Sequence, residues 1–147
     1  MKSSMTRVCA LALLGATLSV APASAQSSGD FAGLYTFQTT NYRSGGEVGV
    51  LSGVARSTPL GGGWYDINLY AIEYIQTASG ESRNTAAQDC EGRREGPVIT
   101  ITCTVVNSDA AGYQPDNFIL RQHNSWQWDG HFTSSSSSSV TFVHYED

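Results

Sequence analysis

The feature that most constrains this chain is a two-residue alternation of apolar and polar side chains that recurs along much of its length. It is clearest in residues 98–106, where the threonines alternate with Ile99, Ile101, Cys103 and Val105. Successive side chains of a β-strand point to opposite faces, so this spacing predicts a strand with one buried and one solvent-facing side. Cys103 then lies on the buried side.

Segments with strand-like patterns recur between connections rich in Gly, Pro, Ser and Asn, which favour turns. They are residues 30–37, 47–56, 64–75, 82–90, 98–106, 118–122, 126–132 and 140–145. No stretch has a persuasive amphipathic helical pattern, although residues 84–88 fit either an edge strand or a single helical turn. These eight segments predict an all-β domain, a small antiparallel β-barrel, with a two-sheet β-sandwich as the alternative.

Three local patterns refine this picture. After Ala71 the alternation slips, and Glu73 is flanked by apolar residues, which predicts a β-bulge or bend. Residues 134–139 are all serine and predict a hairpin connection. The run Gly33-Leu34-Tyr35 is similar to the G-x-W that opens lipocalin-like barrels, with Tyr in place of Trp and no second lipocalin motif. This similarity implies a lipocalin-like general architecture.

Residues 1–25 have the three parts of a cleavable signal peptide. Lys2 and Arg7 precede a short apolar stretch, and Ala23 and Ala25 match the A-x-A pattern of a cleavage site. The apolar stretch is shorter than the roughly 20 residues needed to span a bilayer. We therefore expect an exported protein, periplasmic or secreted.

Residues 26–147 are then expected to form a single acidic domain. Loss of Lys2 and Arg7 leaves no lysine and changes the formal net charge from −5 to −7. Such a domain repels phosphate backbones and anionic lipid, so nucleic acid is not an expected partner. The absence of lysine also excludes Schiff-base chemistry. No later segment resembles a transmembrane helix, and the polar alternating faces disfavour a membrane-spanning barrel.

Two cysteines remain once Cys9 is removed with the leader. Outside the cytoplasm, two thiols in one small domain usually pair, so we predict a disulfide between Cys90 and Cys103. The segment between them is rich in turn residues, which lets the chain reverse and bring the sulfurs together. There is no C-x-x-C spacing or cysteine-histidine cluster, so a redox or metal role is not expected.

The sequence contains no recognisable catalytic constellation. Asp129 and His131 would point the same way on a strand, but a turn beside an exposed or hydrogen-bonded histidine explains them better than a metal site does. His123, His131 and His144 are the only histidines, and no serine lies in G-x-S-x-G. The glycines at 61–63 lack the lysine of a phosphate loop. We therefore predict no enzyme, no metal and no cofactor.

Three tryptophans are the candidate ligand-binding residues. Trp126 and Trp128 share one face of their expected strand, and Trp64 follows the glycine run. Such aromatics line the cavity of a barrel, or simply belong to its core. The expected function is a non-catalytic binding module that holds a small apolar ligand in the barrel cavity. The alternatives are a protein-interaction module, such as an inhibitor, adhesin or envelope component, and, more weakly, an enzyme.

Overall fold

The computed structural model describes residues 29–134 and 138–145. The predicted signal peptide, residues 1–25, lies outside the described residues, as do residues 135–137 of the serine run. Nowhere in the described part is there a helix with the length and apolar character needed to cross a bilayer.

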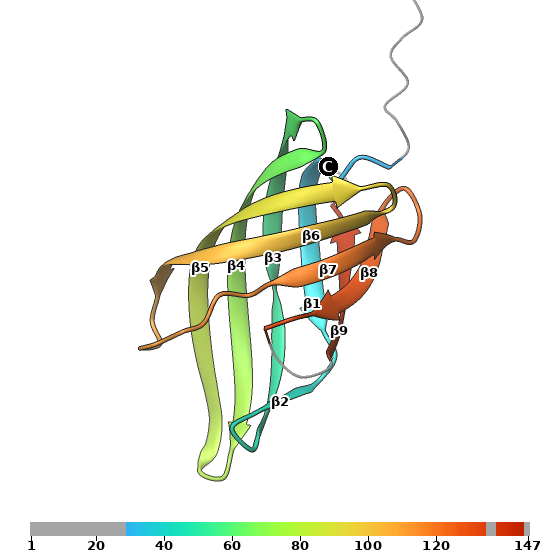
Figure 1. Ribbon diagram of the computed structural model, residues 1–147. Helices are drawn as coiled ribbons and strands as arrows, with labels where there is room; N and C mark the ends of the chain where they lie inside the picture. The colour runs from blue at the N-terminus through green and yellow to red at the C-terminus, as the bar shows by residue number, and fades with distance from the viewer. Residues whose placement is uncertain (1–28, 135–137, 146–147) are drawn as a thin grey trace, which may run out of the picture.

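The described chain forms nine antiparallel β-strands. They are β1 (Gly33–Thr39), β2 (Tyr42–Ser44), β3 (Glu47–Gly61), β4 (Trp64–Thr77), β5 (Gly80–Glu95), β6 (Val98–Ser108), β7 (Phe118–Gln122), β8 (Gln127–Phe132) and β9 (Ser138–His144). The sheet order is β1-β9-β8-β7-β6-β5-β4-β3-β2, and β1 also pairs with β3. Eight strands therefore close into an antiparallel barrel, with β2 as an extra strand on β3 (Figure 1). The barrel prediction is confirmed, and the sandwich alternative does not describe this fold.

Aromatic side chains fill the inside of the barrel. The largest of them, each no more than 3% exposed, are Phe31, Tyr35, Phe37, Phe118, Trp128 and Phe142. The Phe37 ring stacks on Phe142 with centroids 4.9 Å apart, and the Phe31 ring meets Trp128 edge to face at 5.2 Å. Burial of large rings is a dominant stabilising contribution in a small core. The centre of the barrel is thus occupied by the protein's own side chains.

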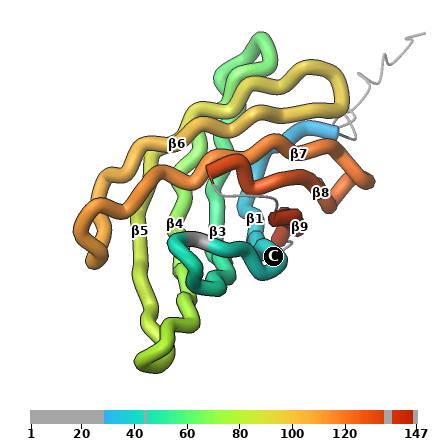
Figure 2. Tube along the Cα trace, turned by 60° about the horizontal axis from the view of Figure 1, so that its bottom comes forward, coloured from blue at the N-terminus to red at the C-terminus, as the bar shows by residue number. Residues whose placement is uncertain are grey.

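The strands on one side of the barrel are much longer than the others. β3, β4 and β5 contain 15, 14 and 16 residues, whereas β7 contains five. The turn between β4 and β5 projects beyond the short strands (Figure 1). Figure 2 brings this end forward and shows β2 and the connection between β6 and β7 there as well. We call this end the mouth of the barrel.

Two sequence details are decided by the strand register. Residues 84–88 belong to β5, so the helical alternative is excluded. Of the β-bulge or bend predicted after Ala71, the bulge is excluded, because β4 pairs in unbroken register with β5 throughout and with β3 across this region. Glu73 lies on the same inward side as Ala71, at the point where the barrel interior becomes polar. The register shifts lie instead between Pro59 and Gly61, and between Ala87 and Gln88.

The predicted disulfide is formed. Cys90 on β5 and Cys103 on β6 are directly paired in register, with Cα atoms 3.9 Å apart, and both are buried. The hairpin between them turns at Gly96, whose φ of 58° lies in the left-handed region that glycine tolerates. The turn-rich segment therefore brings the two sulfurs together as expected.

Candidate functional site

A pocket of about 260 Å³ lies at the mouth of the barrel. We call it the mouth pocket. Its walls come from β2, β4, β5, the β6–β7 connection and the end of β8. Its lining residues include Tyr42, Glu73, Asn84, Tyr113, Asp116 and Phe132.

The floor of the mouth pocket is aromatic. The rings of Tyr42 and Phe132 have centroids 5.4 Å apart, and Phe132 in turn contacts Phe118 of the core at 5.6 Å. Gly49 pairs directly with Tyr42, and a Cβ at Gly49 would lie 2.7 Å from the Tyr42 ring. The missing side chain at this position leaves room for the ring to fold over the end of the core.

Glu73 is the first of two carboxylates in the pocket. Its Oε1 accepts a hydrogen bond from the Tyr42 hydroxyl, and its Oε2 accepts one from Asn84 Nδ2 at 3.0 Å. Burial, followed by the bond to Glu73, raises the pKa of Tyr42 far above its ordinary value, so the phenol stays a donor. Glu73 is therefore held in place by two neutral groups.

Asp116 is the second carboxylate, and it is only 3% exposed. Its Oδ2 accepts bonds from Gln88 Nε2 at 2.5 Å and from the Tyr113 hydroxyl at 2.9 Å. Gln88 Oε1 also accepts the backbone N–H of Asp116 at 2.8 Å, which makes the contact reciprocal. Within the described residues, Oδ1 accepts no hydrogen bond. One carboxylate oxygen of this pocket-lining residue therefore has no hydrogen-bond donor among the described residues.

The pKa of Asp116 is raised to about 6, mainly by burial and to a smaller extent by the nearby charge of Glu73, while the bonds from Gln88 and Tyr113 oppose the shift. The same surroundings raise the pKa of Tyr113, first through burial and then through the charge of Asp116. The mouth pocket therefore contains carboxylates that repel one another in a partly dehydrated space. None of the described residues that line it is Lys, Arg or His.

The connection between β6 and β7 is fixed on β5 at its start. The register shift at Gln88 leaves Val106 as an extra, exposed residue on β6, and the chain then turns over the mouth. Asp109 accepts bonds from the backbone N–H and the hydroxyl of Thr85 at 2.6 and 2.9 Å. These bonds lower the pKa of Asp109.

At the other end of this connection, Asn117 Oδ1 accepts the backbone N–H of Cys103 at 2.8 Å. The Ser134 hydroxyl accepts the backbone N–H of Asn117 at 2.8 Å and donates to the Pro115 carbonyl at 2.6 Å. Together with the Gln88–Asp116 contact, these bonds hold the pocket wall at both ends.

The three candidate tryptophans do not gather around one cavity. Trp128 is fully buried in the core, whereas Trp126 is 48% exposed and precedes β8. Trp64 is 40% exposed, and the Arg93 guanidinium lies over its ring, 4.7 Å from the centroid. Arg94 lies similarly over Trp128 at 5.5 Å. None of the three lines the mouth pocket.

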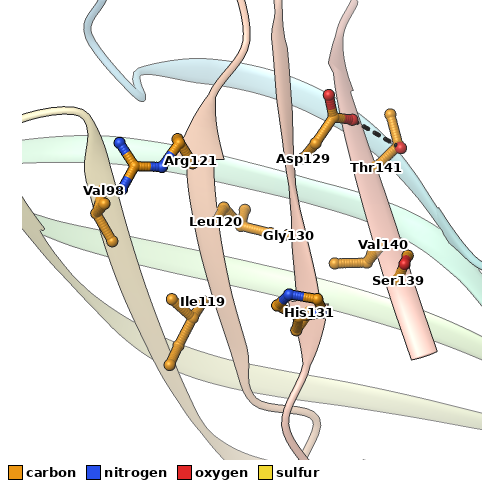
Figure 3. Close-up of a pocket in the computed structure, with 10 residues that line it drawn as sticks. All are labelled: Val98, Ile119, Leu120, Arg121, Asp129, Gly130, His131, Ser139, Val140 and Thr141. Carbon is orange, nitrogen blue, oxygen red and sulfur yellow. Dashed lines mark hydrogen bonds between the residues drawn. The ribbon is translucent and has the colours of Figure 1, made fainter. Parts of the chain in front are cut away.

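A second, more open groove of about 550 Å³ lies on the outer face of β7, β8 and β9 (Figure 3). Asp129 and His131 share this outward face, as their spacing predicts. Asp129 Oδ1 accepts a bond from Thr141 at 2.8 Å, and His123 Nδ1 lies 3.3 Å from Asp129 Oδ2. Across the described part of the chain, no three His, Cys, Asp or Glu side chains are grouped as metal ligands. The groove has fewer buried polar groups than the mouth pocket.

Sequence reasoning missed the residues of the mouth pocket. Glu73 carried a signal, because an acid on the inward side of an otherwise apolar strand is unusual. Asp116 and Gln88 carried none, since 28 residues separate them and only the closed barrel brings them into contact.

Comparison with known proteins supports the fold and leaves the family open. No protein-family model matches the sequence, and no curated protein matches it. Among solved structures, the chain is similar to a redesigned beta barrel, with a TM-score of 0.54 and 14% sequence identity. The match covers 78% of this chain and 91% of that one. At this identity the likeness concerns the barrel fold alone.

Proposed function

We propose that this chain is a small exported binding protein that holds a small molecule in the mouth pocket without converting it. The observation that carries the proposal is the convergence of aromatic rings and buried, hydrogen-bonded polar groups on one pocket at the end of a filled barrel. Binding sites in barrels are often found at the mouth, and buried groups with perturbed pKa values are enriched there.

This proposal moves the ligand away from the position expected from sequence. A cavity lined by Trp64, Trp126 and Trp128 would need these residues to face a common space inside the barrel. That interior is packed with side chains, so the mouth pocket is the better place for a ligand. Its floor supplies apolar contact through Tyr42 and Phe132, and its walls supply polar contact through Glu73 and Asp116.

A non-catalytic role fits the chemistry of the mouth pocket. Asp116, with its raised pKa, resembles a general acid, but its Oδ2 and its backbone N–H are used to tie the pocket wall to Gln88. The described lining residues include no histidine, cysteine or lysine to act as a partner in catalysis.

Export is supported by two independent features. Residues 1–25 have the pattern of a signal peptide, and Cys90 and Cys103 form a disulfide of the kind that persists outside the cytoplasm. We propose a periplasmic or secreted location on these grounds. Peptide mass spectrometry of the protein recovered from the native host tests it, with Gln26 as the expected first residue.

The binding proposal is tested by native mass spectrometry of the protein isolated from its own compartment. Wild type should retain a small-molecule adduct. Ala111→Trp, which fills the mouth pocket, should lose the adduct, whereas Thr102→Trp, on the exposed outer face of β6, should keep it. Binding elsewhere is indicated if all three proteins carry the same adduct, and a bare wild-type monomer argues for a protein partner instead.

A protein-interaction role is the second candidate, favoured by one observation. The outer faces of β3, β4 and β6 have exposed apolar side chains at Val54, Tyr70 and Val106, which line a shallow groove of about 410 Å³. Exposed apolar patches of this kind mark contact surfaces. Photo-crosslinking from position 70 in the native compartment should capture a protein if this role is correct, with position 102 as the control.

A further inference from the structure

We propose that the ligand of the mouth pocket is a small organic cation, such as a quaternary or protonated amine. This inference rests on the proposed function and names the ligand class. It is carried by the juxtaposition of two carboxylates, Glu73 and Asp116, with the aromatic rings of Tyr42, Tyr113 and Phe132 around one pocket of about 260 Å³.

The charge of the mouth pocket is not balanced by the protein. Its described lining residues include two acids and no basic side chain, and the hydrogen-bond donors to those acids, Tyr42, Asn84, Gln88 and Tyr113, are all neutral. Two carboxylates near one another in a space of reduced dielectric constant repel, so a cation between them relieves that repulsion.

One carboxylate oxygen is available to meet such a cation. Both side-chain bonds accepted by Asp116 go to Oδ2, and its Oδ1 accepts no hydrogen bond from the described residues. An ionised carboxylate oxygen accepts hydrogen bonds and attracts cations, so a ligand in the pocket can contact Oδ1. Burial is the main cause of the raised pKa of Asp116, and the negative charge of Glu73 adds to it.

The aromatic rings distinguish an organic cation from a metal ion. Hard metal ions prefer six or more oxygen ligands, whereas the described part of the pocket offers two carboxylates and no group of three metal-ligating side chains. Aromatic rings attract alkylammonium groups through the negative faces of their π-systems, and they also cover the alkyl surface. Tyr42, Tyr113 and Phe132 therefore suit an ammonium ion that carries carbon.

The test compares choline with its uncharged carbon isostere, 3,3-dimethylbutan-1-ol. Each is titrated into ¹⁵N-labelled, disulfide-intact protein, and the amide shifts of residues 110–114, Asp116, Asn117 and Asn84 report binding in the mouth pocket. We expect choline to bind at least about fivefold more tightly than the isostere, which is the range of a partly buried cation–π and carboxylate contact.

Variants then show which carboxylate is responsible for the binding of choline. Glu73→Gln should reduce choline affinity at least about fivefold and leave the isostere unchanged, whereas Glu91→Gln, the same change on the exposed outer face of β5, should alter neither. Asp116→Asn is a second variant in case Glu73→Gln disturbs the fold, and well-dispersed amide spectra verify that each variant is folded.

Each outcome separates this inference from the proposed function. Equal binding of both probes in the mouth pocket overturns the cation inference and leaves the binding function intact. Shifts that lie outside the pocket, or choline binding that is lost equally in Glu91→Gln, show attraction to the acidic surface and also overturn the inference. If neither probe moves the pocket amides, the cation inference fails, and the adduct experiment above decides whether the binding function fails with it.

Discussion

Trp126 and Trp128 show how two neighbouring residues of one type come to have different roles. Strict alternation would place both on the same face. The chain instead makes a tight turn before β8, in which the backbone N–H groups of His123 and Asn124 both donate to the Gln127 carbonyl. Trp126 lies in that turn and is exposed, whereas Trp128 lies within β8 and is buried.

A truncation pair tests this difference in burial. Trp128→Ala should reduce the free energy of unfolding by about 3–5 kcal/mol, because it removes the largest buried side chain and leaves a cavity. Trp126→Ala should change it by about 0.5 kcal/mol or less. Urea denaturation followed by circular dichroism measures both, and similar losses in the two variants would contradict the assignment of Trp128 to the core.

Asp116 makes the stability of the protein depend on pH in a specific window. Its pKa is raised from 3.8 to about 6 in the folded state, so between these values the folded protein holds a proton that the unfolded chain has released. Stability contributed by this group is therefore present at pH 4 and falls as the pH rises to about 6. The cause of the fall is the free-energy cost of ionising Asp116 in its buried position.

Asp116→Asn should flatten this part of the pH profile. We expect the variant to gain about 1–3 kcal/mol relative to wild type between pH 4 and pH 7, since the amide has no charge to bury and still accepts bonds from Gln88 and Tyr113. Urea midpoints at pH 4, 5, 6 and 7 measure the effect. Asp66→Asn on the exposed face of β4 is the control, and parallel profiles for wild type and Asp116→Asn would refute the prediction.

At the scale of elements, the hairpin of β5 and β6 is joined covalently across the pair Cys90–Cys103. Replacing both cysteines by alanine should cost about 3 kcal/mol, because the unfolded chain regains the freedom of a loop that the bridge closes. Urea denaturation with and without reductant checks this. Reductant should destabilise wild type by a similar amount and leave the double variant unchanged.

β7 and β8 approach one another closely at Gly130, which lies between Leu120 and Val140 (Figure 3). A Cβ built at Gly130 would lie 1.9 Å from the backbone carbonyl oxygen of Ile119, a contact that no rotamer change relieves. The two strands would have to move apart.

Gly130→Ala should therefore lower the free energy of unfolding by about 2 kcal/mol or more. Thermal or urea denaturation measures the loss, with Ser139→Ala on the exposed face of β9 as the control. Wild-type stability in Gly130→Ala would mean that β7 and β8 are less closely packed than the structure indicates.

At the scale of the whole molecule, the pairing of β1 with β3 closes the barrel, so the long and the short strands enclose one shared core. Gly33 pairs with Ser57 and Tyr35 pairs with Ala55 across this seam, while Tyr35 also pairs with His144 on β9. No strand pair of the closed barrel can open without exposing the shared aromatic core. Cooperative unfolding is the consequence.

We accordingly expect a single two-state transition. Far-ultraviolet circular dichroism, which reports all the strands, and tryptophan fluorescence, which includes buried Trp128, should give coincident urea curves for the disulfide-intact protein. Separate midpoints would show that the long β3–β5 hairpins unfold independently of the rest.

The alternation of side chains by itself determined that this chain is a β-protein and which residues of several strands are buried. Ile67, Leu69 and Ala71 on β4, and Ile99, Ile101 and Cys103 on β6, are buried as their period predicts. The Cys90–Cys103 bridge could also be predicted from the sequence, because both cysteines lie in one hairpin and the residues that form its turn lie between them. These properties follow from the two-residue repeat of a strand, which needs no knowledge of the partner strand.

Only the tertiary structure decided where the barrel closes, how the interior is filled and where a pocket remains. The slip after Ala71 is not a bulge, because β4 continues in register and Glu73 simply reaches the polar mouth. The contact of Gln88 with Asp116 joins residues 28 positions apart, and no local pattern encodes it. The positions of Glu73, Gln88 and Asp116 are set by the register between strands that are distant in sequence and by the one-residue shift at Gln88. That register depends on the free energy of the whole closed sheet rather than on any one segment.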